Sequence, residues 1–291
     1  MSTPTVLCFG EVLWDCLPAG LFLGGAPGNV AYHLKRHGCE PYFASAVGND
    51  FLGDEIRRRA AGWGLSTDLL ATVENAPTGV VQVDATSPTK PVYTIVDNVA
   101  WDQIPATVAL LDGARSADAV VFGTLALRHG YNRATLDGLL AETQALRVLD
   151  INLRPPFTAP DVLDFALTRA DILKLNDQEI AGVGSPEPSV GELPALAESW
   201  AMRYDLKAVC VTCGAHGAGL WSGGEWNWVD GRVVTVKDTV GAGDAFLAAL
   251  LAGLLRGDGD KEALIAACRT GEFVASRDGA TPAYDAADIL G

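Results

Sequence analysis

Short apolar runs alternate with stretches of helical periodicity along most of the chain. The apolar runs are bounded by turn-forming residues and predict β-strands at residues 6–9, 42–46, 119–122, 147–151, 172–175 and 208–212. The stretches between them predict helices at residues 28–37, 51–61, 132–145 and 193–204. Because strands and helices alternate, we expect an α/β fold with a mostly parallel central sheet and helices on both faces.

One region departs from this alternation. Residues 79–84 and 91–96 are rich in Val, Thr and Tyr, and they flank the turn-rich linker 85–90. This pattern predicts an antiparallel hairpin inserted into the α/β domain, and the apolar segment 12–23 could pair with it. Such a flap could cover a ligand or a subunit interface. A plain edge hairpin is the alternative interpretation.

The composition is that of an ordered, acidic protein. Hydrophobic residues make up 49% of the 291 residues and charged residues 20%. This composition supports a large hydrophobic core in a single domain over residues 1–291. We place the lid segments of this domain at about residues 12–24 and 79–102. A net charge of −15 repels nucleic-acid backbones, so we expect no nucleic-acid partner. A phosphorylated ligand must therefore be held by local features.

The sequence shows no sign of a membrane or secreted protein. No apolar window reaches the length of a membrane helix, and residues 1–4 carry no basic side chain. We therefore expect a cytoplasmic protein without a membrane partner. The six cysteines are scattered and read as reduced core thiols. Cys210 and Cys213 form a C-x-x-C pair, but zinc would need a second pair, so we expect a structural role.

The strongest chemical motif lies at residues 238–244, which read Asp-Thr-Val-Gly-Ala-Gly-Asp and precede an apolar helical run at 245–255. Two glycines before a helix expose backbone amides, and the helix dipole adds to an anion site. Asp244 opposes anion binding by its charge, so it makes sense as a base that takes a proton from a hydroxyl beside the phosphate. The alternative is an aspartate that caps the helix. The chain contains no Gly-x4-Gly-Lys-Ser/Thr pattern, which excludes a Walker loop. Gly241 and Gly243 lack the third glycine of the dinucleotide-binding fingerprint, which excludes that loop as well.

A second glycine-rich motif opens the first predicted helix. Gly24 and Gly25 permit close backbone approach, and Asn29 can place a two-way hydrogen-bonding amide in a polar pocket. An ordinary glycine turn before a helix is the alternative. His33 and His37 follow on one helix face, yet Leu34 stands where a metalloprotease helix has glutamate, so we expect no metal there.

These two motifs, in this order and at this separation, resemble the signatures of the ribokinase-like (PfkB) carbohydrate kinase family. The resemblance covers essentially the whole chain, and it extends to segments at residues 10–15, 149–154, 176–179 and 211–217. Within the family, bacterial fructokinases are the most similar, because of residues 24–29 and the lid sequence 93–102. The resemblance implies a ribokinase-like three-layer α/β/α sandwich with a small β lid.

The resemblance also implies roles for individual residues. Sugar binding falls to Asp15, Gly24, Gly25, Asn29, Tyr93 and Asn152. Phosphoryl transfer falls to Asp244, to the amides of Gly241, Ala242 and Gly243, and to Arg154, which counters charge. Nucleotide contacts are implied for Asn176, Thr212, Gly214, Gly217 and Cys268. Glu179 would act on Mg²⁺ through water, and Asp238, Val240 and Gly279 would hold a monovalent cation such as K⁺.

The implied activity is ATP-dependent phosphorylation of a sugar hydroxyl, with D-fructose and its 6-hydroxyl as the leading substrate. Kinases of 2-keto-3-deoxygluconate, ribose or a nucleoside share the same catalytic set and remain alternatives. A non-catalytic sugar sensor is a third interpretation, which the presence of Asp244 and its glycines disfavours. The resemblance further implies a homodimer formed through the β lid.

Overall fold

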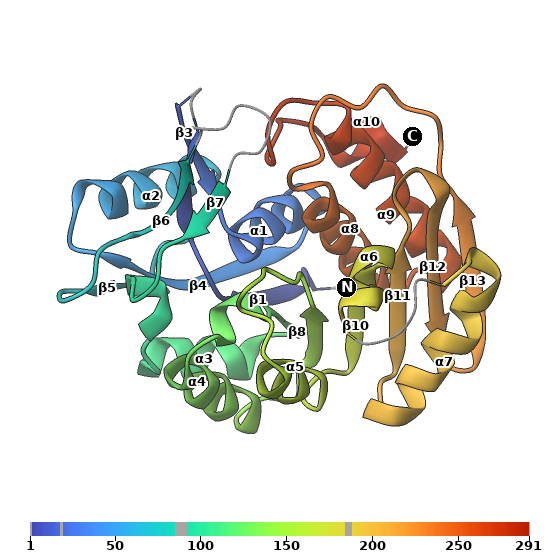
Figure 1. Cartoon of the computed structure of the whole chain (residues 1–291), viewed down its shortest axis with the longest axis horizontal. Coiled ribbons are helices and arrows are strands. Elements are labelled where there is room, and N and C mark those ends of the chain that lie inside the picture. The colour runs from blue at the N-terminus through green and yellow to red at the C-terminus, as the bar shows by residue number, and fades with distance from the viewer. Residues whose placement is uncertain (1, 18–19, 85–91, 184–187, 291) are drawn as a thin grey trace.

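The structure is a computed structural model, and it describes residues 2–17, 20–84, 92–183 and 188–290. Its centre is a nine-stranded sheet with the strand order β13-β12-β11-β10-β9-β8-β1-β4-β5 (Figure 1). The strands of this sheet are β1 (Thr5–Phe9), β4 (Glu40–Gly48), β5 (Leu70–Val73), β8 (Ala119–Gly123), β9 (Leu146–Asp150), β10 (Ile172–Asn176), β11 (Ala208–Thr212), β12 (Gly217–Ser222) and β13 (Glu225–Asp230). All pairs from β5 to β11 are parallel, whereas β12 and β13 are antiparallel.

Helices cover both faces of this sheet. They are α1 (Ala26–Arg36), α2 (Phe51–Gly62), α3 (Val108–Ser116), α4 (Gly130–Ala141), α5 (Pro160–Leu167), α6 (Asp177–Gly182), α7 (Leu193–Tyr204), α8 (Ala242–Arg256), α9 (Asp260–Ala275) and α10 (Ala286–Leu290). In Figure 1, α1, α8 and α9 lie on one side of the sheet, and α3, α4 and α5 lie on the other. The expected three-layer arrangement is therefore confirmed.

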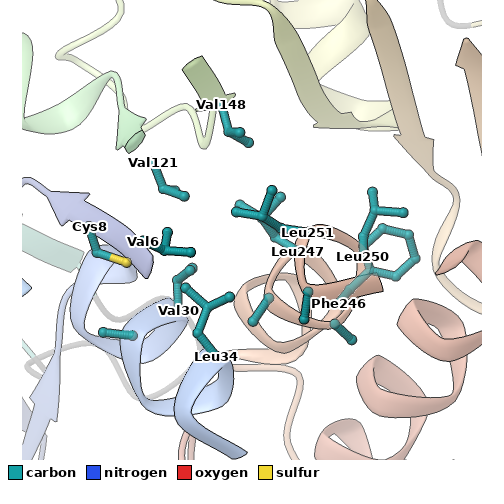
Figure 2. Packing of buried hydrophobic residues seen from close by; sticks show 14 of the residues in the cluster. Val6, Cys8, Val30, Leu34, Val121, Val148, Phe246, Leu247, Leu250 and Leu251 are labelled. Carbon is teal, nitrogen blue, oxygen red and sulfur yellow. The ribbon is translucent and has the colours of Figure 1, made fainter. Parts of the chain in front are cut away.

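The core follows the two-residue period of the strands. Val6 and Cys8 of β1 belong to a buried cluster with α1 and α8, whereas Leu7 and Phe9 belong to a second cluster on the opposite face. Figure 2 shows Val30 and Leu34 of α1 and Leu247 and Leu251 of α8 gathered against Val6, Val121 and Val148 of the sheet. Because α1 and α8 share this core, their N-terminal ends are held in a fixed relation.

A second, four-stranded sheet has the order β3-β2-β6-β7 and is built from β2 (Leu13–Leu17), β3 (Gly20–Gly24), β6 (Gly79–Asp84) and β7 (Val92–Ile95). The predicted hairpin is confirmed, since β6 pairs antiparallel with β7. Strand β2 pairs antiparallel with β3 and parallel with β6, so the segment 12–23 does join the hairpin. The predicted linker 85–90 and the side chain of Tyr93 lie outside the described residues.

All six strands and all four helices predicted from the first pattern are present. The pattern did not predict β5 or the helices α3, α5, α6, α9 and α10. It also missed β12 and β13, which form an antiparallel hairpin around Gly223 and Gly224 with φ values of 57° and 89°. Adjacent glycines with positive φ are typical of a two-residue hairpin turn, so a local signal was available. In the part of the chain that the structure describes, no helix combines the length and apolar character that a membrane crossing requires.

Candidate active site

The N-terminus of α8 is the centre of the site. Gly241 is its N-cap residue and adopts the left-handed conformation with φ 76°. A Cβ atom at Gly241 would lie 2.6 Å from Cα of Ala280, so no larger residue fits. The amide of Ala242 donates to the carbonyl of Thr239 at 3.3 Å, and the helix dipole points its positive end into this loop. That this loop binds an anion stays a prediction.

Asp244 lies in the first turn of α8, and its carboxylate Oδ2 accepts a hydrogen bond from the side-chain amide of Asn29 at 2.8 Å. Burial and the nearby Asp150 carboxylate raise the pKa of Asp244 to about 6, against the opposing effects of Asn29, Lys174 and Arg154. The N-cap position belongs to Gly241, so the alternative interpretation of Asp244 as a helix cap is wrong. A carboxylate that titrates near neutrality can accept a proton.

Sequence reasoning missed Lys174, which lies in the middle of β10. Its ammonium Nζ lies 3.0 and 3.1 Å from the two oxygens of Asp150, and both side chains are buried. A Cβ atom at Gly243 would lie 3.1 Å from this Nζ, so the ammonium faces the glycine loop. Burial alone would lower the pKa of Lys174, but the carboxylates of Asp150, Glu179 and Asp244 raise it. A lysine inside an apolar strand was the available signal, because buried lysines require an acidic partner.

Four of the residues predicted to bind sugar, Asp15, Gly24, Gly25 and Asn29, come from β2, β3 and the start of α1. A Cβ atom at Gly24 would lie 2.5 Å from Oδ2 of Asp15, and one at Gly25, which has φ 110°, would lie 2.5 Å from the carbonyl oxygen of Glu11. Burial raises the pKa of Asp15, and the charge of Arg154 opposes this rise. The structure therefore places Asp15 beside Gly24 in the first motif, and Asn29 of the same motif beside Asp244.

The loop after β9 carries Asn152, which is predicted to bind sugar, and Arg154, which is predicted to counter charge in phosphoryl transfer. Asn152 has φ 40°, an uncommon conformation for a residue other than glycine. Arg154 is exposed, and its Nη1 donates to the carbonyl of Leu153 at 3.0 Å. Its positive charge still acts on Asp15 and Asp244, because it opposes the rise that burial causes in the pKa of both carboxyls. Arg154 is thus close to the site and free of any carboxylate partner among the described residues.

A cavity of about 560 Å³ adjoins the glycine loop. The five residues expected to contact nucleotide all line it, and they are Asn176, Thr212, Gly214, Gly217 and Cys268. Lys174, Ala242 and Gly243 line it as well, so the cavity opens onto the predicted anion site. Its volume is within the range of small-molecule sites.

Glu179 connects two strand ends. Its Oε2 accepts the amide of Asn176 at 2.8 Å, and its Oε1 accepts the amide of Leu153 at 2.9 Å. The side-chain oxygen of Asn176 accepts the amide of Glu179 in return at 2.8 Å, which is the reciprocal arrangement of a capping box. Burial raises the pKa of Glu179, and Lys174 opposes this rise. The Asn-x-x-Glu segment therefore has a structural role, and its action on magnesium stays a prediction.

The residues predicted to hold a monovalent cation come together. Asp238 accepts the amide of Val240 at 3.0 Å with one oxygen and the amide of Gly279 at 3.2 Å with the other. The loop after α9 thereby packs against the start of the second motif. A potassium requirement is not decided by this contact and stays a prediction.

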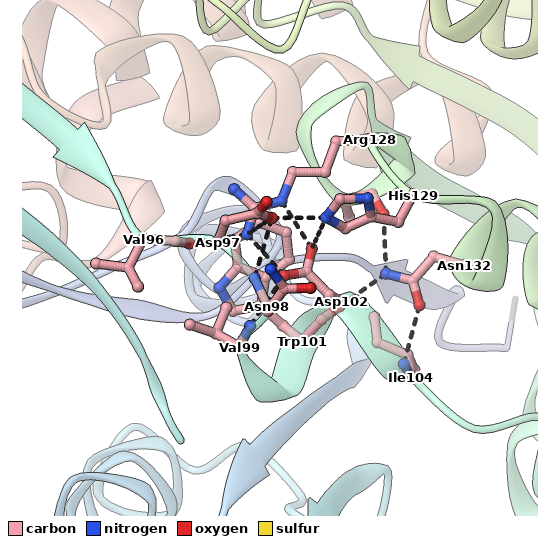
Figure 3. Close-up of polar contacts among 11 residues, drawn as sticks. Val96, Asp97, Asn98, Val99, Trp101, Asp102, Ile104, Arg128, His129 and Asn132 are labelled. Atoms are coloured by element: carbon pink, nitrogen blue, oxygen red, sulfur yellow. Dashed lines mark hydrogen bonds and ion pairs between the residues drawn. The ribbon is translucent and has the colours of Figure 1, made fainter. Parts of the chain in front are cut away.

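A polar cluster that the sequence did not reveal links the end of the lid segment 79–102 to Arg128, His129 and Asn132 (Figure 3). Arg128 pairs with both oxygens of Asp102 at 2.7 Å and donates to the carbonyl of Val96 at 2.8 Å. Its guanidinium carbon lies 4.0 Å from the centre of the Trp101 ring. Asp97, Asp102 and His129 have the spacing of a metal site, but Arg128 already neutralises Asp102. The cluster therefore fastens the end of β7 to the core.

Comparisons with known proteins agree with this geometry. The family model described as "pfkB family carbohydrate kinase" matches residues 9–287. A fructokinase from Rhizobium leguminosarum bv. trifolii is 30% identical over 271 residues, which cover 86% of this chain and 79% of the relative.

Two solved structures are similar in fold. The 2-dehydro-3-deoxygluconokinase of Thermotoga maritima has a TM-score of 0.84 at 22% identity and covers 98% of both chains. The fructokinase of Vibrio cholerae O395, solved with fructose, ADP and calcium ion, has a TM-score of 0.82 at 22% identity and covers 100% of both chains. With a family model that matches nearly its whole length, this chain belongs to the pfkB family of carbohydrate kinases and is a sugar kinase.

Proposed function

We propose that this kinase transfers the γ-phosphate of ATP to the 6-hydroxyl of fructose, with Asp244 as the catalytic base. The observation that carries the proposal is the position of Asp244. It lies in the first turn of α8, bonded to Asn29 at 2.8 Å on the sugar side and adjacent to the glycine loop on the nucleotide side. A base for phosphoryl transfer must lie between these two ligands.

The residues divide the chemistry as follows. Ionised Asp244 accepts the proton of the sugar hydroxyl, and the sugar oxygen forms a bond to the γ-phosphorus while the bond from phosphorus to the β–γ bridging oxygen breaks. ADP leaves with that oxygen. The ammonium of Lys174 beside Gly243 and the amides at the start of α8 oppose the charge on the phosphoryl oxygens. Arg154, which has no carboxylate partner among the residues that the structure describes, is available to add a further positive charge.

The carboxylates of Glu179 and Asp150 fit a magnesium ion held through water. Both are buried oxygen donors beside Lys174, and Mg²⁺ binds oxygen ligands while keeping several waters. The backbone amides on Glu179 and the ammonium on Asp150 leave lone pairs for a water but disfavour direct coordination. When bound, the ion neutralises phosphate charge. The proposed potassium site is formed by Asp238, Val240 and Gly279.

Fructose is supported by relatives rather than by a bound ligand. The Rhizobium relative is a fructokinase, and the similar Vibrio structure carries fructose and ADP. The similar Thermotoga structure is a kinase of 2-dehydro-3-deoxygluconate, so that acid sugar is the second candidate. We also propose that the reaction takes place in the cytoplasm, where ATP is available.

One coupled assay of ADP formation tests the function. We expect turnover with fructose to exceed turnover with 2-keto-3-deoxygluconate, ribose and a nucleoside at equal concentration. Asp244→Asn should abolish turnover and retain sugar binding by calorimetry. It should also stay folded, because it removes a carboxylate whose ionisation burial disfavours. Substantial activity in this variant would sink the assignment of Asp244. Sugar binding by the wild type without ADP formation from any sugar would indicate a sensor.

The lid also supports a proposed homodimer. Strand β3 is the edge of the small sheet, and its residues Leu21 and Phe22 are 48% and 44% exposed. An exposed apolar edge strand invites pairing with another chain. Phe22→Asp should convert a dimer to a monomer in light scattering, whereas Met202→Asp, at an exposed position of α7 that lies far from the lid in Figure 1, should not. A monomeric wild-type protein would exclude the dimer.

A further inference from the structure

Helix α1 contacts two parts of the catalytic apparatus from one face. Asn29 and His33 lie one helical turn apart, and both are buried, with exposures of 5% and 0%. Asn29 donates to Asp244. Both ring nitrogens of His33 contact the loop that follows α9. Nε2 lies 2.9 Å from the carbonyl oxygen of Ala280, and Nδ1 lies 2.8 Å from the hydroxyl of Tyr284.

The partners of His33 fix its protonation. A carbonyl oxygen can only accept, so Nε2 carries the hydrogen and donates to Ala280. Burial lowers the pKa of His33 to about 4, so the ring is neutral near pH 7 and Nδ1 accepts from the hydroxyl of Tyr284. The hydroxyl of Tyr32 adds a third contact by donating to the carbonyl of Pro282 at 2.8 Å. Helix α1 thus holds residues 280–284 at three points.

The segment held by His33 is the one that packs against the glycine loop. Ala280 is the residue that a Cβ atom at Gly241 would meet at 2.6 Å. The amide of Gly279 donates to Asp238 at 3.2 Å, and Asp238 accepts the amide of Val240. A shift of residues 279–280 would therefore reach Gly241, which sets the direction of the amides at the start of α8.

We propose that His33 is a positioning residue for phosphoryl transfer. It fixes residues 279–284 against the glycine loop, and this contact keeps the amides of that loop in a fixed position relative to Asp244. The role of His33 follows from its place on α1, one helical turn after Asn29. Asn29 orients the side chain of Asp244, and His33 orients residues 279–284, which pack against the glycine loop. This role rests on the proposed kinase chemistry and adds a residue that touches neither sugar nor nucleotide.

Steady-state kinetics separate positioning from a general loss of structure. His33→Phe keeps an aromatic ring, slightly larger than imidazole, and removes both hydrogen bonds, so kcat should fall by about 10- to 100-fold while the KM for sugar changes by less than about threefold. His33→Gln can still donate to the Ala280 carbonyl and should recover most of kcat. Tyr284→Phe removes only the hydrogen bond to Nδ1 and should give an intermediate kcat, and its melting temperature should fall because a buried acceptor loses its donor.

Several results would overturn the proposal. One is a wild-type kcat in folded His33→Phe, and another is a loss of kcat in His33→Gln as large as that in His33→Phe. A third is a rise in the sugar KM of His33→Phe that matches its loss in kcat. If His33→Phe does not fold, the Gln and Tyr284→Phe variants still decide.

Hydrogen exchange tests the positioning role without turnover. In the full-length variant His33→Phe, peptides covering 238–243 and 279–284 should exchange faster than in the wild type, whereas peptides from α4 should be unchanged. Unaltered exchange at 238–243 would overturn the proposal. Failure of the wild type to phosphorylate any sugar would instead refute the proposed function, and the exchange result would still stand.

Discussion

The side-chain amide of Asn29 donates a hydrogen bond of 2.8 Å to the carboxylate of Asp244, across 215 positions of sequence. This contact joins the two glycine-rich motifs at the point where sugar and phosphate would meet. The hydrogen bond lowers the pKa of Asp244, but burial and Asp150 outweigh it and leave the pKa at about 6. The ionisation of one carboxylate should therefore govern the rate.

The pH dependence of kcat/KM follows from this pKa. Asp244 can accept a proton only when it is ionised, so activity should be on a plateau above about pH 7 and fall as pH decreases through about 6. At pH 5 the value should be about tenfold below the plateau. Kinetics between pH 5 and 8, on enzyme whose circular dichroism is constant over that range, provide the measurement.

Asn29→Ala tests the contribution of the hydrogen bond. Because that bond stabilises the ionised carboxylate, its loss should raise the pKa of Asp244 and move the acid limb to higher pH. The variant should also weaken sugar binding if Asn29 holds a hydroxyl, so the position of the limb is the informative quantity. A limb at the wild-type pH, or one moved to lower pH, would contradict the assignment of the titration to Asp244.

Lys174 should be needed for both activity and stability. Lys174→Met removes the ammonium beside Gly243 and should lower kcat by about 100-fold or more. It also leaves Asp150 buried without its partner, which should lower the free energy of unfolding by about 3–5 kcal/mol. Urea denaturation and the ADP assay give the two values.

A double variant separates these two effects. In Lys174→Met/Asp150→Asn no buried charge is left unpaired, so part of the free energy of unfolding should return while kcat stays low. Lys261→Met changes an exposed lysine and serves as the matched control, with both quantities near wild type. Recovery of activity in the double variant would mean that Lys174 only neutralises Asp150.

The sequence predicted the parts of the site that depend on local backbone geometry. Gly25 and Gly241 stand out because only glycine fits where they lie, and the apolar period predicted the sheet and both of its covered faces. The contact of Asn29 with Asp244 joins residues 215 apart, and no local pattern encodes it. The pairing of Lys174 with Asp150 was missed for the same reason, since it depends on the adjacency of β9 and β10.

Gly24→Ala should impair sugar binding selectively. The added methyl group would lie 2.5 Å from Oδ2 of Asp15, so the carboxylate must move. We expect kcat/KM for sugar to fall by about 10- to 100-fold, and the KM for nucleotide to stay within about twofold of wild type. Gly138→Ala, on an exposed position of α4 with no atom within 4 Å, is the control and should leave kinetics unchanged. An equal effect on both substrates would indicate a general disturbance.

Arg128 should stabilise the return of the lid into the core. Its side chain is 1% exposed and pairs with Asp102, which is 4% exposed, whereas the pair of Arg133 with Asp161 is 24% and 66% exposed. Arg128→Met leaves a buried carboxylate unpaired and should cost about 3–5 kcal/mol of unfolding free energy. Arg133→Ala breaks an exposed pair and should cost less than about 1 kcal/mol. The double variant Arg128→Met/Asp102→Asn should recover part of the lost unfolding free energy, because asparagine carries no charge. Its side-chain oxygen can still accept the amide of Val99, as Asp102 does at 3.0 Å. Equal stabilities of the two single variants in urea would show that the buried pair does not fasten the lid.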